Sequence, residues 1–375
     1  MKRLGLVLLV AAFVLGLTVA AQAESFKLGV LSPLTGTYAQ DGTDILNAVK
    51  LAVEHFGKLP GFDKIEILSE DSGSDGGKAV MAANKLINSK VNGVVGAYAS
   101  GETIPASEPI NKANIIQITP SSSNEKVTAR GFKQLFRMCP RDDTQAWSAT
   151  EILEKYLKVK TIAMIDDRSA YAAGLAKNIV ADLAKNNLVK VVAHENIAQG
   201  DKDFTAVLTK IKGLNPDVVY MSLYQPEASM MIRQIKSLGI TAKVMSEDAV
   251  YHPKYIEVGG KDTEGTLFTF SYAPESDYRK KFIDDFKSTY KATDVGTYAY
   301  FGYDCAMTIL GAVKKAGSAD TDKVAAAIRG GTWPGVTGDI KFDDVGDRKI
   351  AYALWETKGG KYVPVWDPLT GQPIK

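Results

Sequence analysis

The clearest pattern in this chain is GVVGAYASGETIPASEPINKANIIQITPSSSN, which occupies residues 93–124. Its two apolar runs, Gly93–Ala97 and Ile115–Thr119, are too short and too β-branched for buried helices, so they predict buried parallel strands. The residues between them, Thr103–Ala113, predict a helix that tolerates Pro105 in its first turn. The segment is therefore expected to form a strand–helix–strand unit of an open α/β sheet.

Small hydroxyl side chains follow both predicted strands. Ligands of open α/β sheets lie beyond the carboxyl ends of the strands, where free N–H groups at a helix start suit a carboxylate or another small anion. Helix caps and turns account for the same residue types equally well, so the spacing alone leaves both interpretations open. The residues are Ser100 and Thr103 after the first strand, and Ser121, Ser122 and Ser123 after the second.

The first 23 residues are typical of a secretory signal peptide. Lys2 and Arg3 precede an apolar run from Leu4 to Ala20, and the small-residue cleavage pattern Ala21-Gln22-Ala23 follows. The run is short for a membrane span. We therefore expect an exported mature protein that begins near Glu24.

Charge and cysteine content argue against several classes of protein. Removal of Lys2 and Arg3 lowers the count of basic residues from 45 to 43, which equals the 43 acidic residues, so neither nucleic-acid nor membrane-surface binding is indicated. The three histidines are isolated, so no metal or cofactor is expected. Cys139 and Cys305 could pair in an oxidising compartment, but we expect two buried thiols.

About 350 mature residues exceed what one hydrophobic core usually supports, so two domains are expected. A first alternation of strands and helices begins at Phe26, and a second, independent one runs from Thr144 to Ser246. This order predicts two similar, doubly wound α/β lobes, with the first crossing between them in residues 132–143. The tail predicts a β-meander of three strands, Thr337–Phe342, Ala351–Glu356 and Tyr362–Trp366.

The sequence lacks the short signatures of common enzymes, including the glycine-rich nucleotide loops and the G-x-S-x-G elbow. Two carboxylate pairs, Asp166-Asp167 and Glu247-Asp248, end predicted strands. Adjacent side chains on an extended segment point to opposite faces, so neither pair is expected to act as an acid/base couple. We therefore expect a protein that is not an enzyme.

Aromatic and acidic side chains end predicted strands in the second half of the chain. They are Tyr171, Tyr224 and Asp248. Facing the hydroxyl groups of the first half across a cleft, they would fit a zwitterion, with its ammonium at Asp248 and its apolar side chain among the tyrosines. Core packing of the tyrosines and helix capping by Asp248 are the alternative interpretations.

Six segments are specific through their order and spacing together: KLGVLSPLTGTYAQDG at 27–42, AVMAANKLIN at 79–88, ITPSSSNEKVTARG at 118–131, DDRSAYAAGLAKN at 166–178, GDKDFTAVLTKIK at 200–212 and YMSLYQPEASMMIRQIKSLG at 220–239. With them the mature chain resembles, over nearly its full length, the type I periplasmic substrate-binding proteins of the leucine/isoleucine/valine-binding family, which serve ABC transporters. The resemblance implies a monomer in the periplasm that closes two lobes on a small amino acid and delivers it to an inner-membrane permease. It also implies three crossovers, with residues 24–140 and 272–340 in lobe 1 and residues 141–271 and 341–375 in lobe 2.

The resemblance also implies roles for individual residues. Ser100 and the Ser121–Ser123 loop would hold the carboxylate and ammonium of the ligand, and Asp248 would bind the ammonium. Tyr171, Tyr224 and Tyr300 would be the aromatic side chains of the pocket. Asp41 stands where leucine-binding members commonly have an aromatic residue, so the resemblance leaves the ligand's side chain open. An amide or an aromatic acid as ligand, and a periplasmic sensor or enzyme for a small acid, remain alternatives at this point.

Overall fold

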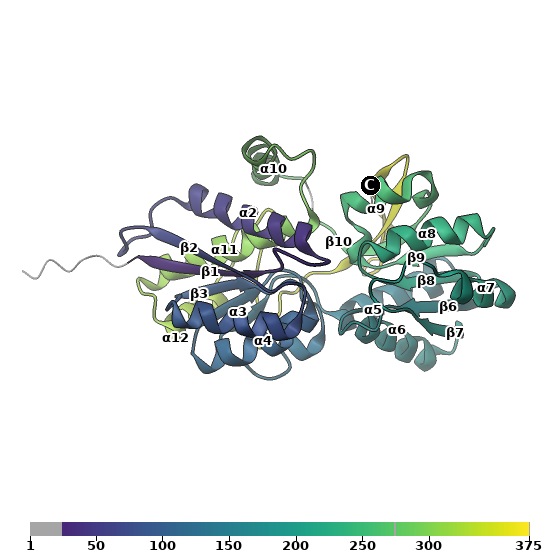
Figure 1. The fold of residues 1–375 in the computed structure, drawn as a ribbon, viewed down its shortest axis with the longest axis horizontal. Helices are drawn as coiled ribbons and strands as arrows, with labels where there is room; N and C mark the ends of the chain where they lie inside the picture. Colours follow the sequence, from purple (N-terminus) through teal and green to yellow (C-terminus); the bar gives the residue numbers. More distant parts are fainter. Residues whose placement is uncertain (1–24, 274, 375) are drawn as a thin grey trace, which may run out of the picture.

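The computed structural model describes residues 25–273 and 275–374. They form two α/β lobes side by side, each built around one sheet (Figure 1). We call the lobe around the five-stranded sheet the first lobe and the lobe around the eight-stranded sheet the second lobe. This arrangement confirms the predicted α/β fold of two doubly wound lobes.

The first lobe contains a parallel sheet in the order β2-β1-β3-β4-β5. Its strands are β1 (Phe26–Ser32), β2 (Ile65–Asp71), β3 (Gly93–Gly96), β4 (Ile116–Thr119) and β5 (Leu135–Arg137). The helices between them are α2 (Ala39–Phe56), α3 (Gly76–Asn88), α4 (Ser100–Lys112) and the 3₁₀ turn η1 (Glu125–Val127). Three later helices return to this lobe, namely α10 (Asp277–Tyr290), α11 (Thr297–Ala316) and α12 (Thr321–Arg329), and α11 packs against α2, β3 and β4.

The second lobe contains a mixed sheet in the order β13-β12-β11-β10-β9-β8-β6-β7. Its parallel part comprises β6 (Thr161–Asp166), β7 (Lys190–Asn196), β8 (Val218–Ser222), β9 (Lys243–Ser246) and β10 (Leu267–Ser271), and its antiparallel edge comprises β11 (Tyr352–Lys358), β12 (Lys361–Asp367) and β13 (Gln372–Pro373). The helices are α5 (Asp142–Glu151), which continues as the π-helical turn η2 (Ile152–Tyr156), then α6 (Ala172–Asn186), α7 (Thr205–Leu214), α8 (Glu227–Ser237), η3 (Asp248–Val250), α9 (Pro253–Gly259) and η4 (Gly260–Thr263).

The hydrophobic periodicity explains why these elements form. In α2 the residues Ile45, Ala48, Val49 and Ala52 recur at helical spacing, and all four are fully buried against the sheet and α11. The central strands β3, β4 and β8 are buried along their whole length, as expected for strands covered by helices on both faces.

Two of the predicted details are wrong, and one element was missed. β5 is a strand of the first sheet, although its three residues were assigned to the crossing. Thr337–Phe342 is not a continuous strand, because the backbone N–H of Thr337 donates to the buried carboxylate of Asp304 at 3.0 Å and only Ile340 and Phe342 form isolated bridges, with Trp333 and Arg348. The short helix α9 was not predicted. Cys139 and Cys305 are buried free thiols.

Residues 341–348 lie against β5 in the first lobe. Phe342 packs edge-on against Phe136 with ring centres 5.3 Å apart, and Arg137 pairs with Asp347 in a parallel bridge. The predicted lobe boundary at residue 341 falls within this segment. We therefore propose that the third crossing follows Arg348, immediately before β11.

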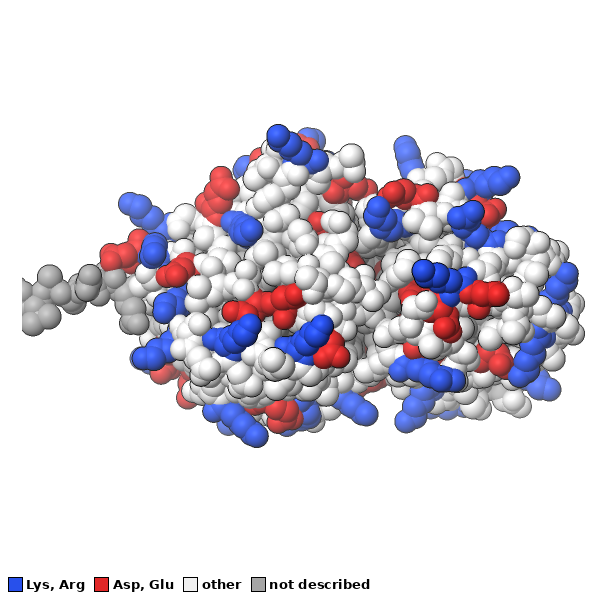
Figure 2. Space-filling view, viewed as in Figure 1, with Lys and Arg blue, Asp and Glu red and all other residues white. Residues whose placement is uncertain are grey.

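Lys, Arg, Asp and Glu side chains are interspersed over both lobes on the face shown in Figure 2. This distribution agrees with the formal neutrality of the mature sequence. Among the residues that the structure describes, no helix has the length and apolar content needed to cross a bilayer.

Candidate ligand-binding site

A small cavity lies between the two lobes, at the carboxyl ends of their central strands, and its side chains approach so closely that it has no room for a water molecule in this structure. Hydroxyl groups, aromatic rings and one carboxylate line it. The lining residues are Tyr98, Ser121, Ser123, Tyr171, Tyr224, Asp248 and Tyr298. Five of these seven are residues that the sequence singled out, so the structure brings most of the predicted site together.

The lobes contact each other beside this cavity. Tyr38 of the first lobe packs against Tyr224 of the second with ring centres 4.7 Å apart, and its hydroxyl accepts a hydrogen bond of 2.6 Å from Gln199 Nε2. Asn124 Nδ2 donates across the interface to the carbonyl oxygen of Ala170 at 2.8 Å. The structure therefore shows the lobes closed around the site.

On the first lobe the site is formed by residues 121–124, which we call the serine loop. Ser121 Oγ donates to the carbonyl oxygen of Tyr98 at 2.8 Å, and Ser123 also lines the cavity. Ser122 turns away from the cavity and shares a hydrogen bond of 2.6 Å with Thr103. Ser100 Oγ accepts the backbone N–H of Asn124 at 3.2 Å. Ser100, Thr103 and Ser122 thus support the loop, whereas Ser121 and Ser123 face the ligand space.

On the second lobe Asp248 is the acidic group of the cavity. Tyr298 OH donates to its Oδ2 at 2.8 Å, Gln145 Nε2 donates to its Oδ1 at 2.9 Å, and Tyr171 OH also donates to Oδ1. The side chain is almost fully buried, and no cationic side chain among the described residues forms an ion pair with it. A buried carboxylate of this kind lacks a counter-charge, which an ammonium group in the cavity would supply.

Glu247 immediately precedes Asp248, and Tyr171 OH contacts both carboxylates. The expectation that the two side chains diverge is wrong, because the chain leaves the extended conformation after β9 and enters the turn η3. It is Glu247 that caps this turn by accepting the N–H of Ala249 at 2.6 Å, which leaves Asp248 facing the cavity. Burial, followed by the neighbouring Asp248 carboxylate, raises the pKa of Glu247 well above its ordinary value.

The other carboxylate pair, Asp166-Asp167, lies at the end of β6, and Asp166 is bound by side chains of the second lobe. His194 Nε2 lies 2.6 Å from Asp166 Oδ2. Burial raises the pKa of Asp166, but hydrogen bonds from His194, the N–H of Arg168 and Asn196 outweigh it and hold that pKa below its ordinary value. The same hydrogen bond raises the pKa of His194 despite its partial burial.

These opposite pKa shifts predict a pH-dependent stability. The raised pKa of His194 stabilises the fold fully below the ordinary histidine pKa, and this contribution is lost as the pH rises through the folded-state pKa. We therefore expect His194→Gln to lower the melting temperature more at about pH 6 than at about pH 9. Thermal unfolding of both proteins across this range measures the effect. A loss of the same size at both pH values would contradict the assignment of this ion pair.

Two residues of the cavity, Tyr98 and Tyr298, were missed from the sequence. Tyr98 follows directly on the predicted strand Gly93–Ala97, so its position at a strand end was a usable signal. In the sequence analysis, Tyr300 is predicted in place of Tyr298. Tyr300 is two residues further along α11 and therefore lies on another face of the helix. Tyr300 instead stacks on the guanidinium of Arg279, whose Cζ is 4.5 Å from the ring centre, and lines a separate cavity near Trp355.

Asp41 does not line the cavity either. It is buried in α2, and its Oδ1 lies 3.5 Å from His252 Nε2 of the second lobe. Within residues 25–273 and 275–374, no cluster of three His, Cys, Asp or Glu side chains is placed to hold a metal ion.

Two α/β lobes that enclose a polar and aromatic cavity at their facing strand ends define a two-lobed ligand-binding protein. The chain belongs to the periplasmic binding protein family, whose family model matches residues 25–357. The members of this family are substrate-binding proteins that act in transport.

Curated relatives span almost the whole chain. An amino acid binding protein of Pseudomonas aeruginosa is 34% identical, over 95% of this chain and 97% of that protein. A leucine-, isoleucine-, valine-, threonine- and alanine-binding protein of the same organism is 33% identical, over 87% of this chain and 88% of that protein.

Solved structures share the fold. The leucine binding protein of Thermotoga maritima has a TM-score of 0.84 at 28% identity, covering 90% of this chain and 97% of that chain. A branched-chain amino acid transporter substrate binding protein of Streptococcus pneumoniae, solved with isoleucine, has a TM-score of 0.82 at 26% identity, covering 91% and 99%.

Proposed function

We propose that this protein is the substrate-binding component of an ABC transporter for a branched-chain or related small amino acid. The observation that carries the proposal is the environment of Asp248. This buried carboxylate accepts three hydrogen bonds, lies opposite the serine loop, and forms no ion pair with a cationic side chain among the described residues. In this assignment Asp248 binds the ammonium group and the serine loop binds the carboxylate of the same ligand.

The aromatic rings of the cavity limit which ligand side chains can bind. Tyr98 lies 5.3 Å from Tyr298 and 6.2 Å from Tyr224, measured between ring centres, so the three rings form an apolar wall beside the polar groups. Such a wall suits a short aliphatic side chain. An amide or an aromatic acid offers no positive charge to Asp248, which favours an amino acid over these alternatives.

Binding is coupled to closure of the lobes. The proposed ligand touches Ser121 and Ser123 on one lobe and Asp248 and Tyr171 on the other, so it makes its full set of contacts only in the closed form. Its binding energy therefore shifts the open–closed equilibrium toward the closed form. The protein then presents this form to a membrane permease, without catalysing a reaction.

The proposed setting is the periplasm, with the protein as a monomer that needs no cofactor. Membership of the periplasmic binding protein family supports this location. The predicted signal peptide, residues 1–23, lies outside the described residues.

Thermal unfolding with a ligand panel tests the proposed function. The mature protein is first unfolded and refolded to remove bound ligand, and is then heated with each common amino acid, with benzoate and with small amides. A ligand at a hundred times its dissociation constant adds about 2.7 kcal/mol to the stability of the folded state. We expect leucine, isoleucine or valine to raise the melting temperature. A rise with benzoate or an amide, and with no amino acid, would overturn the ligand assignment.

A further inference from the structure

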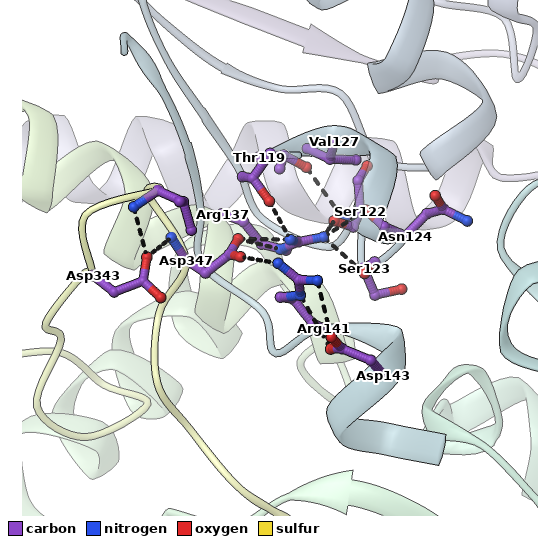
Figure 3. Close-up of polar contacts among 12 residues, drawn as sticks. Thr119, Ser122, Ser123, Asn124, Val127, Arg137, Arg141, Asp143, Asp343 and Asp347 are labelled. Atoms are coloured by element: carbon purple, nitrogen blue, oxygen red, sulfur yellow. Dashed lines mark hydrogen bonds and ion pairs between the residues drawn. The ribbon is translucent and has the colours of Figure 1, made fainter. Parts of the chain in front are cut away.

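One fully buried arginine, Arg137, binds the backbone of the serine loop. It is the last residue of β5. Its Nη1 donates to three consecutive carbonyl oxygens of the loop, at 3.3 Å for Ser122, 2.7 Å for Ser123 and 2.7 Å for Asn124. Figure 3 shows the guanidinium directed at this side of the loop.

Neighbouring groups fix the orientation of this guanidinium. Nε and Nη2 donate to Asp347 Oδ1 at 2.9 and 2.6 Å, and Nη2 also donates to Thr128 Oγ1 at 2.6 Å. Asp347 Oδ2 accepts a further hydrogen bond of 2.9 Å from Arg141 (Figure 3). Asp347 thus compensates the buried charge of Arg137, and the fork of the guanidinium has a single orientation.

The carbonyl contacts determine where the amide hydrogens of the loop point. In a trans peptide the C=O and the following N–H are antiparallel. The carbonyl of Ser122 faces Arg137, so the N–H of Ser123 points away from Arg137. Among residues 25–273 and 275–374 this N–H has no hydrogen-bond partner, and Ser123 lines the cavity. The next N–H, of Asn124, is already bound to Ser100 Oγ.

We propose that Arg137 is a positioning residue for the carboxylate of the ligand. By turning the loop carbonyls inward, it presents the N–H of Ser123 to the cavity as a donor for an anionic oxygen. Its charge also polarises the bonded peptide groups, which strengthens that donor. This inference rests on the proposed function, because it takes the serine loop to be the carboxylate-binding side of the site.

The chain offers a matched control in Arg130. Its guanidinium also binds backbone carbonyls, at 2.8 Å for Ile104, 2.9 Å for Lys126 and 3.2 Å for Val127, and it pairs with Glu108 at 3.0 Å. None of these carbonyls belongs to the serine loop, and Arg130 does not line the cavity. Arg130→Lys therefore removes a comparable set of contacts outside the site.

The test compares the affinities of leucine and leucinamide, which differ only in the carboxylate, at mildly acidic pH where both carry an ammonium. Arg137→Lys keeps the charge but loses the fork. We expect it to reduce the preference for leucine over leucinamide by about tenfold or more, since an aligned hydrogen bond to an ionised group is lost. Arg130→Lys should leave this preference unchanged.

A purely structural role for Arg137 would weaken the binding of both ligands equally, and that result, in a folded variant, would overturn the inference. If Arg137→Lys does not fold, Thr128→Val decides the question, because it removes one acceptor of the fork and leaves the ion pair with Asp347 intact. It should reduce the same preference by a smaller factor, and an unchanged preference would overturn the inference. Failure of the wild-type protein to bind leucine or any other amino acid would instead overturn the proposed function, and the inference with it.

Discussion

Asp248→Ala is expected to weaken the binding of the amino acid by about 2 kcal/mol or more, which corresponds to about 30-fold in the dissociation constant. The variant leaves the ammonium of the ligand in a closed cavity without its carboxylate partner. It also removes the acceptor of Tyr298, whereas Tyr171 and Gln145 keep Glu247 and Thr269 as acceptors.

Isothermal titration calorimetry of the refolded protein measures this loss. Asp182→Ala is the control, because Asp182 is a carboxylate of the same lobe, and within the described part of the chain its side chain pairs only with Lys185, on the surface of α6. The control should bind with wild-type affinity. An unchanged affinity for Asp248→Ala would remove Asp248 from the binding site.

The largest expected effect on stability is that of Gly96→Ala. Gly96 ends β3 with φ of +133°, and a Cβ at this position would lie 2.0 Å from the carbonyl oxygen of Leu31 in the neighbouring strand. Backbone cannot move aside as a flexible side chain can. We therefore expect a loss of about 3 kcal/mol or more in the free energy of unfolding.

Gly101→Ala is the matched control for this substitution. Gly101 lies in α4 just beyond the same strand, and a Cβ there would meet no described atom within 4 Å. Alanine is the better helix former, so this variant should unfold at or slightly above the wild-type midpoint. Urea unfolding of the three proteins compares them, and equal midpoints for Gly96→Ala and wild type would contradict the packing described for β3.

Local sequence patterns were sufficient to predict most of this fold. Buried strands such as β3 and β8 are continuous apolar runs, and α2 has its apolar residues at helical spacing. Each of these elements can therefore be recognised from residues that are close together in the sequence. β5 was missed because three residues give too little pattern, and its place in the sheet depends on pairing with β4. The segment at Thr337 could not be assigned, because its backbone binds Asp304, more than 30 residues away.

The lining of the cavity was predictable where its residues follow strand ends. Ser121, Ser123, Tyr171, Tyr224 and Asp248 all follow predicted strands, and the topology of a parallel sheet brings such positions together. Tyr298 enters from a helix start, where the sequence carries no comparable signal. Arg137 could not be predicted as a part of the site, because its partner Asp347 is 210 residues further along the chain.

One cavity is proposed to recognise both charges of an amino acid, and calorimetric titration with three ligands that share the isobutyl group of leucine measures this. Leucine carries both charges, isoamylamine carries only the ammonium, and 4-methylpentanoate carries only the carboxylate. We expect leucine to bind and each single-charge analogue to bind at least about 100-fold more weakly, because each analogue leaves either Asp248 or the serine loop without a charged partner. Binding of 4-methylpentanoate as tight as that of leucine would contradict the role of Asp248 and the zwitterion assignment.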